Sequence, residues 1–470
     1  MTPEHAQSSS KAMADRLARL AGFTLVAMLL SSVSPGAPSV AVARTGTVNG
    51  RAAIDTALEL ASFDSAWRRV FDTYYDPGMR GLDWKAIRDE YRPLVARARS
   101  RNEVRAIIGR MLGRLGDSHF GIIPSDEVPE SELAAGVGDA PGDVGIDVRF
   151  VAGDLMVVGV DSASPAFRAQ VRPGWIVELI DSVGVASLAS EATNNRERRS
   201  LALHHLLNVI RRLHGPPGST VRVTFRDGAG RSRSLVMVRR PAPGTVVRLG
   251  ALPPIPTHLE QRRIDRARGC VGVIRFNTWM TVIAPAFEDA LAALRSCEGM
   301  VLDLRGNVGG LAAMVMGMAG HFVDSELVLG VMHMRGTEMR YIANPRRVAR
   351  DGSPVQPYAG PLALIVDNLS ASTTEIFVAA LQQHGRARVF GDTTAGEALP
   401  SLLTRLPNGD GMLYAIADLT DPAGRRVEGV GVVPDERLPL SRESLLAGRD
   451  DALAAALRWL DGQRRHPEVP

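Results

Sequence analysis

Large apolar side chains between residues 54 and 115 recur three or four positions apart, which is the spacing of helices that bury one face. The first of these faces ends at Asp76-Pro77-Gly78, and two shorter ones follow around Ile87 and Ile107. The pattern stops at the turn Gly116-Asp117-Ser118-His119. We therefore predict a small helical domain over residues 44–124, and its first apolar face comprises Phe63, Trp67, Phe71, Tyr74 and Tyr75.

Residues 125–240 have a different pattern, in which short apolar runs alternate as strands do. Short helices are expected at 164–169 and 201–213 between these runs. This segment predicts a compact β-rich module. The segment 241–257 follows, and it predicts a linker because five of the sixteen residues from Pro241 to Pro256 are prolines.

From residue 258 to residue 470, predicted strands alternate with predicted helices and a last helix lies near residues 452–460. This alternation is typical of a sheet with parallel strands and right-handed crossovers, so the fold class of this core is α/β. The expected strands are 271–276, 300–304 and 362–366, and the expected helices are 283–294, 311–322 and 375–384.

The first 43 residues have the organisation of a signal peptide. Three basic residues precede an apolar run from Leu20 to Leu30, and Ala41-Val42-Ala43 supplies small residues for cleavage. The run is about half of the ~20 residues that a membrane-spanning helix needs. We predict an exported protein, periplasmic or extracellular, with no stable membrane span after processing. The alternative is that the segment stays uncleaved as a membrane anchor.

Composition narrows the class of protein only a little. With 45% hydrophobic and 23% charged residues, this is an ordinary globular chain, and its 470 residues exceed what one core holds. The formal net charge is +4 and no block of basic residues occurs, so we expect no nucleic-acid partner.

Two cysteines, Cys270 and Cys297, each precede an apolar run that predicts a strand. In an oxidising compartment they fit one disulfide, and two buried free thiols are the alternative. No residues of the chain have the CxxC or HExxH spacing of a metal site. We expect neither a metal nor an organic cofactor.

Ser372 is a candidate nucleophile. The apolar run 362–366 leads through a short polar turn into a helix that begins near Ser372. A serine at such a turn lies beside the unpaired N–H groups and the positive dipole end of the helix. The alternative is a structural role, because Ser372 and Glu375 also have the spacing of a capping box.

A second turn between a strand and a helix, Asp303 to Gly310, contains three glycines. Glycines there allow backbone N–H groups to point into a cavity, as an oxyanion hole requires. The same residues also suit an ordinary tight turn. The spacing of a nucleotide-binding loop is absent from this sequence.

A serine nucleophile needs a base. The only two lysines are Lys11, in the predicted signal peptide, and Lys85, on a helical face, so a Ser–Lys pair has little support. Among the ten histidines, His119 is distinguished by its position in the turn that ends the helical domain. The residues alone favour His119 without deciding between the histidines.

Together, these motifs resemble those of the tail-specific (C-terminal-processing) and tricorn-type serine peptidases, from about Ser62 to Leu460. The resemblance implies a crotonase- or ClpP-like β-α core with parallel strands, an N-terminal helical domain and a PDZ-like β-rich domain over residues 125–240. The matching motifs follow the family's order and are Leu115–His119, Val144–Val148, Ser164–Ala169, Asp303–Gly310, Ser370–Phe377, Gly391–Gly396 and Glu428–Asp435.

The resemblance also implies roles for individual residues. Both branches of the family place the nucleophile at Ser372, and Glu397 stands where the tail-specific branch has its catalytic lysine. Ser118-His119 and Glu428 match the Ser-His-Glu set of the tricorn-like branch. His119 is then the base, oriented by Glu428 with Ser118. The groups that bind the oxyanion are implied to be the backbone N–H groups of Gly310, Gly309 and Thr373.

The implied activity is hydrolysis of peptide bonds in exported proteins or peptides through an acyl-enzyme, either internally or at C-terminal tails. The PDZ-like domain would take a tail as an added strand beside Gly145, Ile146 and Asp147. Gln170 and Trp175 depart from the usual glycine and aspartate of such domains, so a purely structural spacer is an alternative. The other functions considered are a silent binding protein of the same fold, an esterase and, with least support, an acyl-CoA enzyme.

Overall fold

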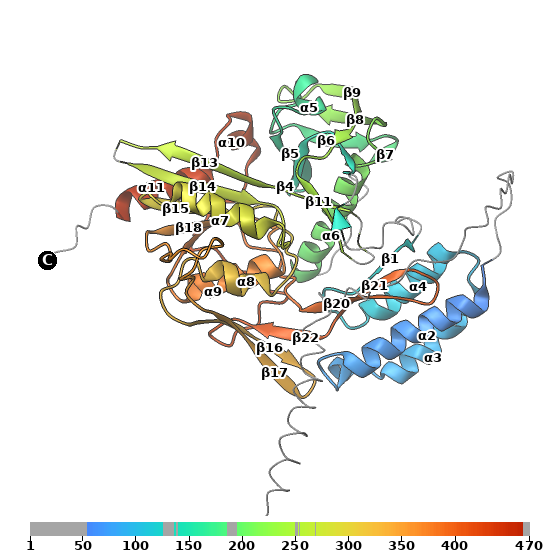
Figure 1. Cartoon of the computed structure of the whole chain (residues 1–470). Helices are drawn as coiled ribbons and strands as arrows, with labels where there is room; N and C mark the ends of the chain where they lie inside the picture. Colours follow the sequence, from blue (N-terminus) through green and yellow to red (C-terminus); the bar gives the residue numbers. More distant parts are fainter. Residues whose placement is uncertain are drawn as a thin grey trace, which may run out of the picture. The chain divides into compact units, whose positions relative to one another are not determined.

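The computed structural model describes residues 54–125, 136–137, 140–185, 195–249, 252, 254–267 and 269–463 (Figure 1). The predicted signal peptide lies outside the described residues. Among the described residues, no helix is long and apolar enough to cross a membrane.

Three helices form the N-terminal part and bury the apolar faces that their sequence predicts. Each begins with a side chain that accepts backbone N–H groups, namely Asp55, Asp83 and Ser100. Their shared core extends to Leu406, Met412 and Tyr414, far along the chain. The helices are α2 (Thr56–Thr73), α3 (Trp84–Arg97) and α4 (Arg101–Gly113), and the three-stranded sheet packed on them is β1 (Gly121–Ile123), β21 (Gly411–Ala415) and β20 (Ser401–Arg405).

The PDZ-like module is built on an antiparallel sheet whose strand order is β4-β5-β6-β8-β9, with β7 (Val183–Gly184) paired to β6. β4 is therefore an edge strand, and the helix α6 (Asn195–Leu213) packs against it. A short helix, α5 (Pro165–Arg168), follows β5. The strands are β4 (Ile146–Val151), β5 (Asp154–Val160), β6 (Ile176–Ile180), β8 (Thr220–Arg226) and β9 (Ser232–Val238).

The segment predicted as a linker contains strands. β11 (Thr245–Arg248) pairs with β12 (Ile255–Thr257) and with β2 (Gly136–Val137). Just before it, β10 (Arg240–Pro241) pairs with β3 (Gly142–Asp143). Two prolines lie within strands, Pro241 in β10 and Pro256 in β12, and they are tolerated because both strands are short and lie at sheet edges.

The core is a six-stranded sheet in the order β13-β14-β15-β18-β19-β23, which confirms the α/β fold class. Only β13 runs antiparallel to its neighbour. Alternate side chains of the sheet face two separate apolar clusters. The strands are β13 (Leu259–Asp265), β14 (Cys270–Phe276), β15 (Gly299–Asp303), β18 (Leu362–Val366), β19 (Arg388–Gly391) and β23 (Glu436–Arg437).

Helices cover both faces of this sheet. The cluster containing Ile274, Leu302 and Leu364 holds α7 (Ile283–Leu294), α8 (Met314–Ala319) and α9 (Thr373–Gln383). The cluster containing Val273, Val301 and Ala363 holds α11 (Asp451–Gln463). A disulfide joins Cys270, the first residue of β14, to Cys297, which lies just before β15.

A second sheet beside the core consists of β17 (Thr337–Ala343), β16 (Leu327–Met334) and β22 (Ala417–Thr420). The sequence pattern did not predict this sheet. The pattern predicts a helix over 311–322, whereas α8 is limited to Met314–Ala319. Residues before α8 are instead held by the parallel bridge between Gly310 and Trp279, in which Leu311 N–H donates to the Trp279 carbonyl at 2.8 Å.

Candidate active site

Ser372 lies at the end of a turn that connects the buried strand β18 to the helix α9. Its backbone has φ 55° and ψ −119°, a conformation that costs a non-glycine residue roughly 1–3 kcal/mol. The Ser372 N–H is shared between the Glu397 carbonyl at 2.8 Å and Glu375 Oε2 at 3.0 Å. These contacts hold the strained conformation in place.

The buried carboxylate of Glu375 accepts hydrogen bonds from two turns. Besides the Ser372 N–H, it accepts Thr394 Oγ1 at 2.5 Å, Gly396 N–H at 2.8 Å and Glu397 N–H at 3.0 Å. Burial raises its pKa to about 7, against the effect of these hydrogen bonds. The capping interaction expected for Glu375 is therefore present and is one of four contacts of this carboxylate.

The glycine turn after β15 lies directly against Ser372. A Cβ atom placed on Gly309 would be 2.7 Å from Ser372 Cβ and 3.1 Å from the Thr373 nitrogen. The Gly309 N–H donates to Asn307 Oδ1 at 3.1 Å, and the Gly310 carbonyl accepts Thr373 Oγ1 at 2.9 Å. Within the described part of the chain, no acceptor is found for the N–H groups of Gly310 and Thr373.

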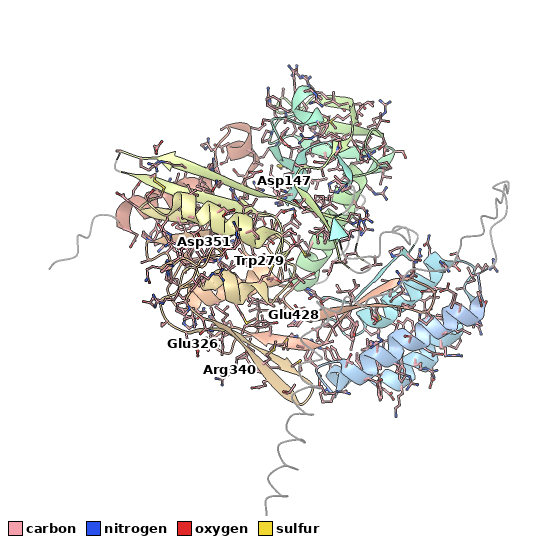
Figure 2. All side chains as sticks on the ribbon, in the orientation of Figure 1. Asp147, Trp279, Glu326, Arg340, Asp351 and Glu428 are labelled. Atoms are coloured by element: carbon pink, nitrogen blue, oxygen red, sulfur yellow. A yellow bond between two sulfur atoms is a disulfide. The ribbon has the colours of Figure 1, made fainter. Side chains whose placement is uncertain are left out.

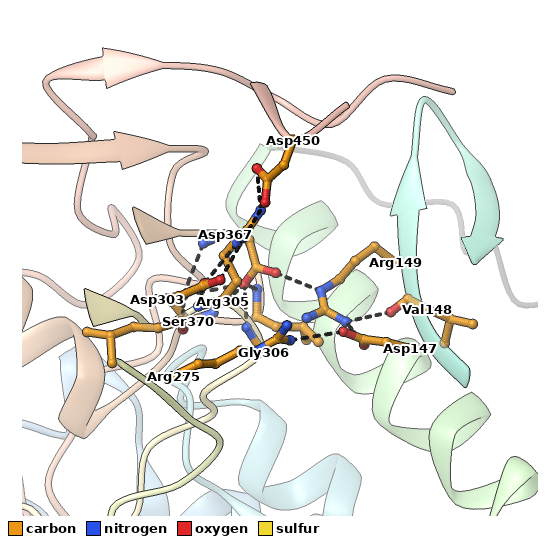
Figure 3. A network of polar contacts seen from close by, with 12 residues as sticks. Asp147, Val148, Arg149, Arg275, Asp303, Arg305, Gly306, Asp367, Ser370 and Asp450 are labelled. Carbon is orange, nitrogen blue, oxygen red and sulfur yellow. Dashed lines mark hydrogen bonds and ion pairs between the residues drawn. The ribbon is translucent and has the colours of Figure 1, made fainter. Parts of the chain in front are cut away.

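Asp367 accepts hydrogen bonds from both the glycine turn and the turn that leads to Ser372 (Figure 3). Asp367 Oδ1 accepts the N–H groups of Gly306 at 2.9 Å, Leu369 at 3.0 Å and Ser370 at 3.1 Å. Its other oxygen accepts Arg149 Nε at 2.7 Å, and this arginine belongs to β4 of the PDZ-like module. A strand of the module is thereby linked to the turns of the core.

The three residues predicted to bind a peptide already form contacts with other residues of the chain. The Gly145 N–H donates to Asp143 Oδ1 at 2.8 Å, and Ile146 pairs with Val160 of β5. Asp147 forms ion pairs with Arg149 and with Arg275, the latter at 3.3 Å. Burial raises the pKa of Asp147, but the charges of the two arginines outweigh it and bring this pKa below its usual range.

His119 occupies the turn after α4, with φ 59°. Its Nδ1 lies 2.7 Å from Ser118 Oγ, and Ser118 Oγ lies 2.9 Å from Glu428 Oε2. A serine hydroxyl has one proton to donate. When it donates to the ionised Glu428, the contact with His119 requires that Nδ1–H donates to Ser118, which leaves Nε2 unprotonated and able to act as a base.

Glu428, labelled in Figure 2, is buried, and hydrogen bonds hold its carboxylate from two chain segments. Its Oε1 accepts Ser118 N–H at 3.0 Å, and its Oε2 accepts Ala398 N–H at 2.9 Å in addition to the Ser118 hydroxyl. Burial raises its pKa, and these hydrogen bonds oppose the rise.

A single peptide unit connects the serine turn to the histidine turn. The carbonyl of Glu397 accepts the Ser372 N–H, and the N–H of Ala398, in the same peptide unit, donates to Glu428. A short series of contacts through this peptide unit therefore connects Ser372 to Glu428, Ser118 and His119. The Glu397 backbone has this position although the residue replaces the lysine of the tail-specific pattern.

Comparison with known proteins identifies two parts of the chain. Residues 270–438 match the family described as Peptidase family S41, and residues 60–113 match the Tricorn protease C1 domain. The chain therefore contains an S41 peptidase domain and is a serine-type peptidase. The C1 match covers most of α2 and all of α3 and α4, and the S41 match covers the core sheet from β14 to β23.

The relatives of this S41 peptidase have names of processing enzymes. It is 27% identical to carboxyl-terminal-processing peptidase 2, chloroplastic, of Arabidopsis thaliana, over 81% of this chain and 68% of that protein. It is also 27% identical to the carboxyl-terminal-processing protease of Picosynechococcus sp., over 80% of this chain and 82% of the relative.

A solved structure has the same fold as the S41 peptidase. The photosystem II D1 C-terminal processing protease aligns with a TM-score of 0.55 at 23% identity, covering 81% of this chain and 93% of that one. This likeness concerns the fold alone.

Several residues around Ser372 were missed by sequence analysis. Asp367 is the first residue after the buried strand β18 and begins the polar turn that follows it. A carboxylate at such a position is a signal that could have identified this residue from the sequence. Asp117 is a neighbour of the predicted Ser118-His119 pair. Arg149 and Arg426 are two of the many arginines of the chain, and nothing in the sequence separates them from the others.

Proposed function

We propose that this peptidase cleaves exported proteins or peptides through an acyl-enzyme on Ser372, with His119 as general base. The observation that carries the proposal is the hydrogen-bonded series from Glu428 through Ser118 to His119 Nδ1, joined to Ser372 by the peptide unit between Glu397 and Ala398. An oriented base beside a strained serine is the arrangement that nucleophilic catalysis needs.

The reaction then has two halves. Ser372 Oγ bonds to the peptide carbonyl carbon as its proton moves to His119 Nε2, and the C–N bond breaks as His119 protonates the leaving amine. Water loses a proton to His119 and attacks the ester, and Ser372 recovers the proton when the acyl group leaves as an acid. Glu428, through Ser118, stabilises the imidazolium formed in each half.

The negative oxygen of each tetrahedral intermediate is assigned to the N–H groups of Gly310 and Thr373. Neither group has an acceptor among the described residues, whereas the N–H of Gly309 is used by Asn307. Gly309 then serves by its lack of a side chain, because a Cβ there would collide with Ser372. Removal of one such donor typically costs about 10²–10³ in kcat.

We assign the helical domain to residues 44–124, the PDZ-like domain to 125–240 and the catalytic core to 258–470. C-terminal tails of substrates are proposed to bind as a strand at the edge of β4, next to Gly145, Ile146 and Asp147. Export is proposed from the N-terminal segment, and a disulfide between Cys270 and Cys297 suits an oxidising compartment.

Labelling with a fluorophosphonate probe followed by peptide mapping tests the nucleophile. We expect one adduct, on Ser372, which is lost in Ser372→Ala and strongly slowed in His119→Ala. Ser353→Ala, which alters an exposed serine bonded to Asp351, is the control and should label as wild type does. An adduct on another serine, or full turnover by folded Ser372→Ala, would refute the assignment.

A further inference from the structure

We infer that Asp117 is a positioning residue for the general base, because it fastens the turn that carries His119 to the segment that carries Glu428. The inference rests on the proposed function, since Asp117 would act through His119 and Glu428. The two carriers are far apart in the chain, with Ser118 and Glu428 separated by 310 positions. Their relative placement therefore depends on cross-links between them.

Asp117 is the centre of a polar cluster. Its own side chain has 0% exposure, whereas the side chains of Arg80 and Arg426 are 36% and 30% exposed. Oδ2 accepts the hydroxyls of Tyr74 and Tyr75 at 2.5 Å each, and Oδ1 accepts the guanidinium groups of Arg80 and Arg426, the latter at 3.2 Å. Four donors match the roughly four lone-pair positions of a carboxylate. Asp117 is thus fixed from several directions.

The cluster keeps Asp117 ionised. Burial raises its pKa, but the hydrogen bonds from Tyr74 and Tyr75 and the charges of Arg426 and Arg80 outweigh burial and bring this pKa below its usual range. The two arginines face two carboxylates, Asp117 and Asp418, so the charges in the cluster balance.

Arg426 connects Asp117 to the segment of Glu428. Its Nε donates to Asp418 Oδ2 of β22 at 2.7 Å, and the same guanidinium reaches the Tyr75 hydroxyl at 2.8 Å. Arg426 lies two residues before Glu428, and Asp117 lies two residues before His119. The ion pair between Asp117 and Arg426 is therefore a second cross-link between the segments that the Ser118–Glu428 hydrogen bonds already join.

The turn needs this second cross-link because of its backbone. Gly116 and His119 both have positive φ values, 67° and 59°, so left-handed residues lie on either side of Asp117 and Ser118. A non-glycine residue holds such a conformation only where its surroundings impose it. Release of Asp117 would let the His119 imidazole shift, and a misplacement of about 1 Å costs on the order of 10²-fold in rate.

The decisive variant is Asp117→Asn, which keeps the shape of the side chain and removes its charge. We expect kcat to fall by about 10²-fold while KM changes by less than about threefold. The rate constant for fluorophosphonate labelling of Ser372 should fall in parallel. The matched control is Asp227→Asn, because Asp227 is also buried and also accepts from two arginines, Arg231 and Arg233, but in the β8–β9 hairpin. Its kcat should equal that of wild type.

A double-mutant cycle tests the route through Arg426. If Asp117 acts through Arg426, the variant carrying both Asp117→Asn and Arg426→Gln is no slower than the slower single variant. Losses that multiply would contradict the inference. Tyr75→Phe removes one hydroxyl from the cluster and replaces Asp117→Asn as the test if that variant does not fold. It should also lower kcat, by a smaller factor than Asp117→Asn. An unchanged kcat would overturn the positioning role of Asp117.

Ser372→Ala in the same series separates this inference from the proposed function. If Ser372→Ala abolishes turnover and labelling while Asp117→Asn behaves like Asp227→Asn, the positioning role is wrong and the mechanism stands. A higher KM with unchanged kcat in Asp117→Asn also overturns the role. If folded Ser372→Ala retains activity, the mechanism and the positioning role fail together.

Discussion

At the scale of single residues, the site is organised by buried carboxylates that collect backbone N–H groups from separate turns. Glu375 joins the turns of Ser372 and Gly396, Asp367 joins those of Gly306 and Ser370, and Glu428 joins Ser118 to Ala398. An ionised oxygen that accepts several N–H groups forms the stronger class of hydrogen bond. Each carboxylate therefore fixes the geometry of two chain segments with one side chain.

The raised pKa of Glu375 predicts a pH effect on stability. A carboxyl group whose pKa is about 7 in the folded protein and 4.5 otherwise contributes stability that is complete below pH 4.5 and is lost as the pH rises through 7. Relative to Glu375→Gln, wild type should lose up to about 3 kcal/mol of unfolding free energy between these pH values. Urea unfolding of both proteins across the range measures it, and parallel curves would contradict the prediction.

Glu397→Ala should be a mild substitution. The contacts of Glu397 to Ser372 and Glu375 are made by its backbone carbonyl and N–H, which alanine keeps. We expect kcat/KM to stay within about tenfold of wild type, against the 10³-fold or greater loss expected for His119→Ala. Comparable losses in the two variants would indicate that residue 397 has taken over the role of the base.

At the scale of elements, the strands and helices with strong periodicity were predicted well. The strand 362–366 and the helix 283–294 have the predicted bounds, because one is a continuous apolar run and the other has a regular buried face. β16, β17, β20, β21 and β22 were missed. Their stability comes from pairing with distant segments, such as β1 with β21, which local patterns do not encode.

The residues of the candidate site also fall into those that local motifs indicate and those that depend on distant contacts. Ser372 could be named as a candidate from its place between a strand and a helix, whereas His119 as the base and Glu428 as its partner came from motifs that resemble those of the family. The peptide unit between Glu397 and Ala398, and the pairing of Asp117 with Arg426, depend on contacts across 30 and 309 positions. A pattern of residues cannot specify which of many arginines reaches a given carboxylate.

The link between β4 and the core predicts a cost for losing Arg149. Arg149 and Asp367 are nearly inaccessible, with 3% and 6% exposure of their side chains. Arg149→Met should lower the unfolding free energy by about 3 kcal/mol, because it leaves the buried Asp367 charge without its counter-ion. Arg233→Met is the control, because the Arg233 side chain, which pairs with Asp227, is 44% exposed. This substitution should lower the unfolding free energy by less than about 1 kcal/mol.

Denaturant unfolding of both variants measures these costs, and labelling of Ser372 reports on the turn that Asp367 holds. We expect slower labelling in Arg149→Met and none of this slowing in Arg233→Met. An Arg149→Met protein with wild-type stability would show that the turn does not depend on the arginine.

At the scale of the whole molecule, stability is shared between distant parts of the chain. The helical part takes core residues from β21, and the disulfide closes a loop between residues 27 positions apart in the core. Replacing both Cys270 and Cys297 by alanine should lower the unfolding free energy by about 3 kcal/mol, mainly by freeing the unfolded chain. Thermal unfolding with and without a reductant measures this, and a reductant should have no effect on the double variant.

The distance in sequence between Ser118 and Glu428 affects the order in which the site can form during synthesis. A ribosome makes the histidine turn first, then the PDZ-like module, then the serine, and the glutamate only near the end, 310 positions after Ser118. Until that last segment has emerged and folded, the histidine has no carboxylate to orient it. Under the proposed mechanism, a growing chain that lacks this segment has no oriented base for peptide hydrolysis.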